Sequence, residues 1–207
     1  MKSKEHIILT IIILLNIIGA IGFNIISMID YFKILTPYNI CFTLILTLYI
    51  LDFKKFIKPF IYIYFTSMII ESFGVKTGVL FGEYQYGETL GIKTFGVPLV
   101  IGVNWFILAI ATRGSVENLK INNLNKSLLS SMIMVLLDFL IEPVAIKLNF
   151  WSWNGGYIPI QNYLMWFGVS FIIQTFILKN DVKILPKLGF TLLISQLIFF
   201  LALQEYV

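Results

Sequence analysis

Residues 81–105 read FGEYQYGETLGIKTFGVPLVIGVNW, and residues 149–166, NFWSWNGGYIPIQNYLMW, repeat their pattern. Each stretch has two aromatic residues separated by one position, then glycine, then a proline, and a tryptophan seven residues after that proline. The matching positions are Tyr84/Tyr86 and Trp151/Trp153, Pro98 and Pro159, and Trp105 and Trp166. Apolar runs flank both stretches, so the pattern predicts two related loops that join helices of one membrane bundle.

Composition indicates an integral membrane protein. Of the 207 residues, 58% are hydrophobic and 13% are charged, whereas a soluble domain has about 25% charged residues. We expect one integral membrane domain, residues 1–207. The net charge of +4 does not indicate nucleic-acid binding, because the basic residues lie in short loops. The lone Cys41 and lone His6 predict no internal disulfide and no metal site.

The apolar runs predict an all-α polytopic bundle of about seven transmembrane helices, and the same runs can be counted as six or eight. The expected helices cover residues 7–29, 37–53, 59–78, 97–112, 127–148, 163–178 and 188–205. The first run is longer than the 7–15 apolar residues of a signal peptide. We therefore expect it to be a retained helix of the bundle.

Basic residues indicate the orientation. If the N-terminus is cytoplasmic, 11 of the 15 basic residues fall inside and 4 outside, as the positive-inside rule requires. The inner set is Lys2, Lys4, Lys54, Lys55, Lys58, Arg113, Lys120, Lys126, Lys179, Lys183 and Lys187; the outer set is Lys33, Lys76, Lys93 and Lys147. The C-terminus is then outside, and the expected location is the cytoplasmic membrane of the cell.

With this orientation both loops, about residues 79–96 and 149–162, lie on the outer side. Helices three and four, and helices five and six, then form a parallel internal repeat around the loops, related by an axis along the membrane normal. The alternative is that the loops are only belts of interfacial tryptophan and tyrosine.

Three acids interrupt apolar helices: Glu71 before the first loop, and Asp138 and Glu142 before the second. About 12 helical residues place Glu71 roughly 18 Å from the inner surface, just past the midplane. Asp138 and Glu142 are four residues apart and share a helix face. An intramembrane acid indicates a functional site; the alternative is that these acids only join helices by hydrogen bonds. Asn104 and Asn162 add polarity near the outer side.

These residue types suit proton-initiated chemistry on an apolar polyene. A carboxylic acid that burial keeps neutral can donate a proton, and protonation of a trisubstituted alkene gives a tertiary carbocation. Aromatic faces stabilise cations. A second carboxylate or an asparagine can then orient water for addition, or accept a proton for elimination.

Two long motifs link the acids to the loops. The first motif is Glu71-x-x-Gly74-x-x-Thr77-Gly78-x-x-Phe81-Gly82-x-Tyr84-x-Tyr86, with Gly96-Val97-Pro98 and Trp105. The second is Asp138-x-x-x-Glu142-Pro143 with Trp151-x-Trp153, Gly156-Tyr157, Pro159, Asn162 and Trp166. Together they resemble the bacterial and archaeal carotenoid biosynthesis membrane proteins, the carotenoid 1′,2′-hydratase and bisanhydrobacterioruberin hydratase-like family. The resemblance covers about residues 60–180.

The resemblance implies cofactor-independent hydration of the terminal alkene of a linear carotenoid ψ-end, giving a tertiary alcohol. Asp138 or Glu71 is then expected to donate the proton, while Glu142 and Asn162 position water. Residues expected to contact the substrate are Tyr84, Tyr86, Trp105, Trp151, Trp153, Tyr157, Trp166 and Asn104. The expected partners are a lipophilic carotenoid, the lipid bilayer and other carotenoid enzymes.

Two other functions stay open. A lycopene-cyclase-like isomerase would use the same protonation step, but an internal alkene would capture the cation. A membrane transporter or lipid-binding scaffold would also account for parallel repeats and midplane acids. The chain lacks the paired Asp-rich motifs of a prenyltransferase and the mid-membrane lysine of a retinal protein.

Overall fold

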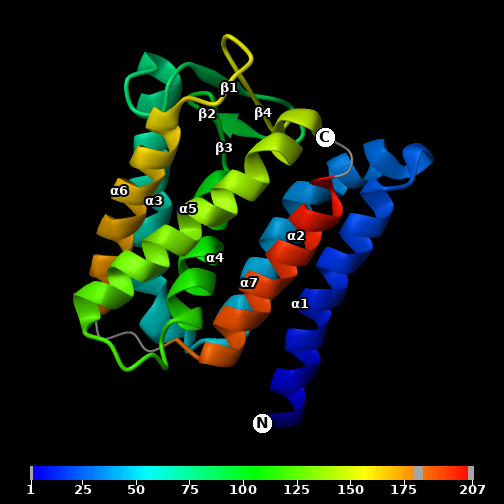
Figure 1. Ribbon diagram of the computed structural model, residues 1–207. Helices are drawn as coiled ribbons and strands as arrows, with labels where there is room; N and C mark the ends of the chain where they lie inside the picture. Colours follow the sequence, from blue (N-terminus) through cyan, green and yellow to red (C-terminus); the bar gives the residue numbers. More distant parts are fainter. Residues whose placement is uncertain (1, 180–183, 205–207) are drawn as a thin grey trace.

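The computed structural model describes residues 2–179 and 184–204. Within these residues seven α-helices form a bundle with a small layer of strands at one end (Figure 1). The helices are α1 (Lys2–Phe23), α2 (Ile29–Ile50), α3 (Phe53–Thr77), α4 (Val100–Ser115), α5 (Asn123–Lys147), α6 (Ile160–Lys179) and α7 (Pro186–Ala202). Lys183 and residues 205–207, on which part of the orientation prediction rests, lie outside the described residues.

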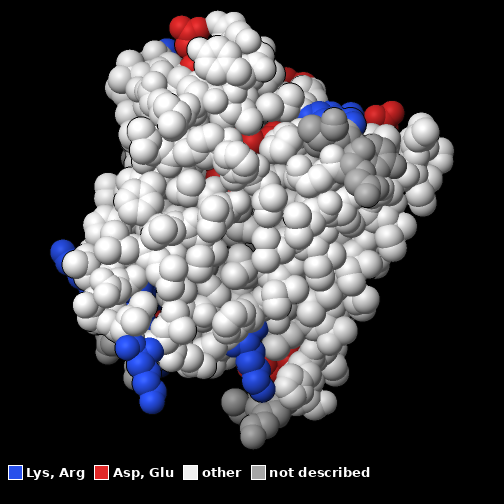
Figure 2. Space-filling model, in the orientation of Figure 1, with Lys and Arg blue, Asp and Glu red and all other residues white. Residues whose placement is uncertain are grey.

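The expected all-α membrane bundle is confirmed. Five of the helices are long and apolar enough to cross a membrane, and α4 and α7 are shorter apolar helices of 16 and 17 residues. Figure 2 shows that charged side chains on one face gather at its two ends, while the broad band between them is almost free of charge. That band has the character of a surface that faces lipid.

The turn between α1 and α2 differs from the prediction. The apolar run expected as one helix over 7–29 ends at Phe23, and a 3₁₀ turn, η1 (Ile26–Met28), leads into α2 at Ile29. Ile25, Ile26 and Met28 keep the mean hydropathy of this turn high, so hydropathy does not reveal the break. Lys33, expected before the second helix, therefore lies inside α2, and Pro37 lies within this helix and not at its start.

Local capping sets the ends of the helices that carry the acids. The Asp52 side chain accepts from the backbone N–H of Lys54 at 3.2 Å, and Asn122 accepts from Asn125 at 2.8 Å. These caps start α3 and α5 in polar sequence, several residues before the expected positions 59 and 127. Gly78 ends α3 with φ +66°, a left-handed conformation that glycine adopts without a Cβ clash.

Helix α4 forms the centre of the bundle. Each of its residues except Asn104 is buried, as expected of a helix that is apolar on all sides. It packs against α2, α3, α5, α6 and α7. At the crossing with α7, a Cβ on Gly189 would meet the backbone of Gly114. The two helices therefore approach through glycine, the small-residue packing common in membranes.

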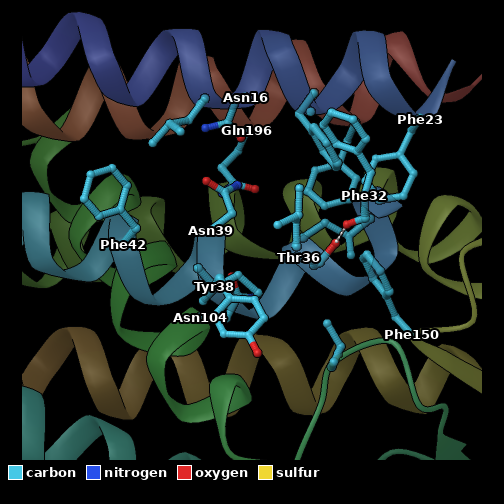
Figure 3. A pocket seen from close by; sticks show the side chains of 18 of the residues that line it. Asn16, Phe23, Phe32, Thr36, Tyr38, Asn39, Phe42, Asn104, Phe150 and Gln196 are labelled. Atoms are coloured by element: carbon cyan, nitrogen blue, oxygen red, sulfur yellow. Dashed lines mark hydrogen bonds between the residues drawn. The ribbon is translucent and has the colours of Figure 1, made fainter. Parts of the chain in front are cut away.

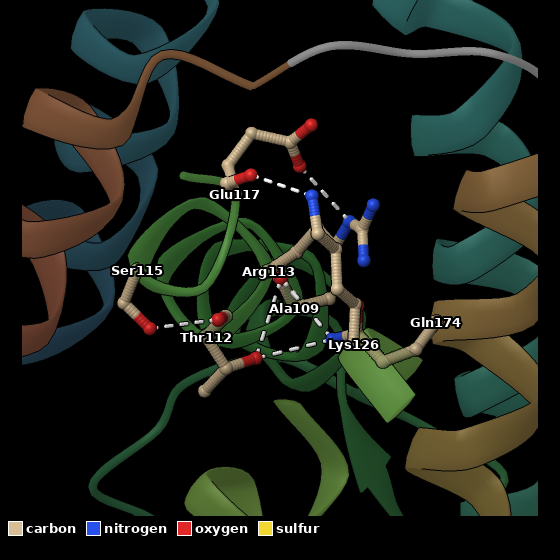
Figure 4. Close-up of polar contacts among 7 residues, drawn as sticks. All are labelled: Ala109, Thr112, Arg113, Ser115, Glu117, Lys126 and Gln174. Carbon is tan, nitrogen blue, oxygen red and sulfur yellow. Dashed lines mark hydrogen bonds and ion pairs between the residues drawn. The ribbon is translucent and has the colours of Figure 1, made fainter. Parts of the chain in front are cut away.

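Polar contacts join the helices at the end of the bundle opposite the strands (Figure 4). Gln174 of α6 donates to the Ala109 carbonyl at 3.2 Å and to the Thr112 hydroxyl at 3.1 Å. Arg113, expected in a loop, lies buried in the last turn of α4, with its Nε 3.3 Å from a Glu117 carboxylate oxygen. Gln174 thus links α6 to the central helix.

The two repeated loops pair with each other, which the sequence did not predict. Strand β1 (Tyr84–Tyr86) of the first loop is antiparallel to β4 (Trp151–Trp153) of the second, and Gln85 lies opposite Ser152. Strands β2 (Lys93–Thr94) and β3 (Val97–Pro98) form a hairpin within the first loop. Helices α3 and α5 both run toward this layer, and α4 and α6 run back (Figure 1). The repeat is therefore parallel, as predicted.

We predict that Gly189→Ala lowers the thermal stability of the purified protein. The added methyl group would push α7 from α4, and overpacking of this kind costs about 1–3 kcal/mol. The matched control is Gly168→Ala on α6, where a Cβ would meet nothing within 4 Å and helix propensity favours alanine. Melting temperatures in detergent measure both. If the Gly189→Ala and Gly168→Ala proteins have the same melting temperature, the proposed close contact between α4 and α7 is contradicted.

Candidate functional site

The buried acids lie directly beneath the paired strands. Glu71 on α3 and Glu142 on α5 both line one small cavity, and Asn162 from the start of α6 lines it too. The cavity measures about 30 Å³, which is room for one or two water molecules. Its other lining residues are Phe81, Tyr84, Tyr86, Ile101, Asn104, Trp105, Ile141, Trp151, Trp153 and Trp166.

Three donors hold the Glu71 carboxyl group. The Tyr84 and Tyr86 hydroxyls donate to Oε2 at 2.5 and 2.9 Å, and the Trp105 indole N–H donates to Oε1 at 3.0 Å. Gly74 lies nearly one turn further along α3, where a Cβ would meet the Phe81 ring. Because Gly74 has no side chain, Phe81 can pack against α3, and the first loop can approach Glu71 closely.

Glu142 has a matching set of three donors. The Trp151 and Trp153 indole N–H groups donate to Oε2 at 2.9 and 2.8 Å. The Asn162 amide donates to Oε1 at 3.1 Å. Both carboxyl groups thus accept hydrogen bonds on both oxygens, which satisfies polar atoms that burial would otherwise penalise.

Strand geometry explains the aromatic-x-aromatic spacing. Successive side chains of a strand point to opposite faces, so Tyr84 and Tyr86 reach the same side of β1, as do Trp151 and Trp153 of β4. Register places Tyr84 opposite Trp153 and Tyr86 opposite Trp151. The four rings therefore cover the acids as one layer, with ring centroids of Tyr84 and Trp153 5.1 Å apart.

The tyrosine hydroxyls of this layer keep their protons. Burial is the largest cause that raises the pKa of the Tyr84 phenol well above its usual value, and burial likewise raises the pKa of Tyr86. A phenol whose pKa is raised stays protonated at neutral pH. Both hydroxyls are therefore available as donors to Glu71.

Trp105 and Trp166, the tryptophans that follow the two repeated prolines, stack on each other beneath the layer. Their ring centroids are 4.4 Å apart with an interplanar angle of 25°. Because they occupy equivalent positions in the two halves, the stack lies where the halves meet. The sequence repeat is thus a structural repeat around the acids.

Two predicted site residues lie apart from the cavity. Asp138 is fully buried but does not line it; its Oδ2 accepts from the Asn162 amide at 2.9 Å. Asp138 Oδ1 has no hydrogen-bond partner in the part of the chain that the structure describes. Tyr157 is 68% exposed in the turn after β4 and is not among the cavity's lining residues.

The remaining predicted residues converge on the cavity, with a different arrangement from the expected one. The space among the aromatic rings is large enough for water but not for an isoprenoid end, and their N–H and O–H groups contact the acids. Sequence reasoning did not single out Ile101 and Ile141 of the lining, since apolar residues in apolar helices carry no signal. In residues 2–179 and 184–204, no group of three His, Cys, Asp or Glu side chains is arranged to hold a metal ion.

Comparison with known proteins gives a family and one relative. The chain is 31% identical over 111 residues to bisanhydrobacterioruberin hydratase of Haloarcula japonica. This segment is 47% of the present chain and 36% of the relative, so the match spans about a third of that protein's length. No solved structure matches the chain.

The family model covers most of the chain. The model described as carotenoid biosynthesis protein matches residues 31–207, a longer segment than the 60–180 on which the resemblance of the motifs rests. The match takes in the two loops, the buried acids and most of helix α2, and it begins after α1. This chain therefore belongs to the carotenoid biosynthesis protein family.

Proposed function

We propose that this protein is a carotenoid hydratase, which adds water to the terminal alkene of a linear carotenoid without a cofactor. The observation that carries the proposal is the water-sized cavity that Glu71 and Glu142 share beneath an aromatic layer. Family membership supports a role in carotenoid modification. The name of the Haloarcula relative supports hydration as the reaction.

In the proposed first step Glu71 donates a proton to the terminal alkene. The proton bonds to the less substituted alkene carbon, the alkene electron pair forms that bond, and the neighbouring carbon becomes a tertiary cation. Glu71 suits this role better than Asp138, because Glu71 lines the cavity and Asp138 does not. The faces of Trp105, Trp166 and the four strand aromatics are placed to stabilise positive charge.

In the second step water adds to the cation. Glu142 and Asn162 orient the water, its oxygen bonds to the cationic carbon, and its proton passes to Glu142. Return of one proton to Glu71 through water in the cavity restores the starting state. The balance is one alkene and one water converted to one tertiary alcohol, with no net proton change.

Asp138 acts in this scheme as a positioning residue. The Asn162 amide nitrogen donates to Asp138 Oδ2 at 2.9 Å and to Glu142 Oε1 at 3.1 Å. Asp138 therefore fixes the rotation of the amide group that faces the water. Its effect on the reaction is expected to pass through Asn162.

The size of the cavity favours hydration over cyclisation. A space of about 30 Å³ accommodates the water that captures the cation, whereas a cyclase must fold an internal alkene over the reacting carbon. Product analysis separates the two reactions. Expression in a lycopene-producing host is expected to yield products heavier by the mass of one water per modified end, measured by mass spectrometry. Products of unchanged mass would favour the cyclase, and unchanged pigment would favour a transporter or scaffold.

The acids are expected to contribute unequally. Glu71→Gln and Glu142→Gln should each lower the hydration rate by about 100-fold or more, since general acid–base groups contribute this much. Asp138→Leu, which removes the acceptor of the Asn162 amide, should cost about tenfold, as expected for a lost hydrogen bond. Glu88→Gln, at a carboxylate that is 89% exposed, is the matched control. Conversion by membranes with equal protein content measures the effects, and full activity of Glu71→Gln would exclude the proposed donor.

The proposed location is the cytoplasmic membrane, with the N-terminus inside and the paired strands outside. In a Cys41→Ser background, Glu88→Cys near β2 should react with a membrane-impermeant maleimide on intact cells. Lys120→Cys, in the exposed connection between α4 and α5, should react only after lysis. Gel shift of the labelled protein measures both. Labelling of Lys120→Cys alone on intact cells would reverse the orientation.

A further inference from the structure

A second, much larger cavity lies beside the acids, between the helices that sequence reasoning left without a function. Its volume is about 430 Å³, within the range of about 300–1,000 Å³ usual for small-molecule sites. Figure 3 shows side chains pointing into it from α1, α2, α4 and α7, among them Asn16, Asn39, Asn104 and Gln196. None of the acids lines it.

The two cavities are adjacent, because they share part of their walls. Ile101, Asn104, Ile141 and Trp151 line both the large cavity and the acid cavity. Trp151 also donates to Glu142 at 2.9 Å. A chain bound in the large cavity would therefore lie against the same wall that faces the acids.

The large cavity also reaches the surface that faces lipid. Its lining includes Ile18 on α1, and Leu35 and Tyr38 on α2, which are 54%, 51% and 69% exposed. These apolar and aromatic side chains lie on helices long enough to cross the membrane. A hydrophobic molecule can thus pass from the bilayer into the cavity without entering water.

Apolar side chains form most of the lining, with a few amides among them. Phe23, Phe32, Phe199 and Phe200 are part of the wall. The Asn39 Oδ1 atom is buried and has no hydrogen-bond partner among the described residues. A mainly apolar wall with a few polar groups is the usual character of a ligand site, and polar side chains within membrane helices often mark function.

We propose that this cavity binds the isoprenoid chain of the substrate and presents its terminal alkene to Glu71 and Glu142. The proposal rests on the proposed function for the identity of the ligand. The end of the chain lies against the wall formed by Ile101, Asn104 and Ile141, and the rest of the polyene leaves between α1 and α2 into the bilayer. Asn39 is placed to accept a hydrogen bond from an oxygen function on the chain.

A filling substitution tests the cavity directly. Leu15 on α1 lines it, whereas the neighbouring Leu14 is 48% exposed and does not. Purified full-length protein is titrated with lycopene, and the induced circular dichroism of the visible band reports binding. Wild type and Leu14→Trp should bind with equal affinity. Leu15→Trp should bind at least about tenfold more weakly, a difference of about 1.4 kcal/mol.

Additional variants and measurements distinguish a failure of the cavity proposal from a failure of the hydratase proposal. If Leu15→Trp does not fold, Thr36→Phe on the α2 wall replaces it, with Ile34→Phe on the exposed face as control. Equal binding by the filled and control variants, or no saturable binding by wild type, would overturn the cavity proposal. If Leu15→Trp abolishes lycopene binding but wild type forms no hydrated product, the cavity proposal stands and the hydratase proposal is overturned. If Leu15→Trp hydrates lycopene as fast as wild type, the cavity proposal is overturned and the hydratase proposal stands.

Discussion

Six hydrogen bonds to two glutamates join the strand layer of this protein to its helices and the helices to one another. Three reach Glu71 from Tyr84, Tyr86 and Trp105, and three reach Glu142 from Trp151, Trp153 and Asn162. A carboxyl group within a membrane bundle is costly to bury unless its oxygens are satisfied. The pairing of β1 with β4, the aromatic layer and the stack of Trp105 on Trp166 all place donors where these acids need them.

The two halves share a plan but differ in chemistry. The equivalent loops supply two phenol hydroxyls to Glu71 and two indole N–H groups to Glu142. The third donor is Trp105 in one half, whereas in the other it is Asn162, which also contacts Asp138. Four residues before Glu71, the position matching Asp138 holds Ser67, whose hydroxyl donates to the Tyr64 carbonyl of its own helix. This asymmetry fits the separate roles proposed for Glu71 as acid and Glu142 as base.

Sequence reasoning reached the bundle, the parallel repeat and most of the cavity residues, because each leaves a local signal. Apolar runs marked the helices, and the spacing of Tyr84 and Tyr86 marked the loop. The pairing of β1 with β4 joins residues more than 60 positions apart, and no local pattern encodes it. The exposure of Tyr157 and the placement of Asp138 behind Asn162 likewise depend on how side chains pack. The large cavity is formed by side chains from four helices. Its position therefore cannot be inferred from a single amide such as Asn39 in the sequence.

The contrast between the two cavities limits which chemistry the site can support. The larger space is mainly apolar and open toward lipid, while the smaller one is lined by two carboxyl groups and is the size of one or two waters. A polyene in the first brings a neutral alkene to the edge of the second, so no charge crosses the bilayer before reaction. Electrostatic interactions are stronger in such a buried site than in bulk water. A cation formed at the shared wall would therefore be attracted by any carboxylate charge on Glu142, beside the water that captures it.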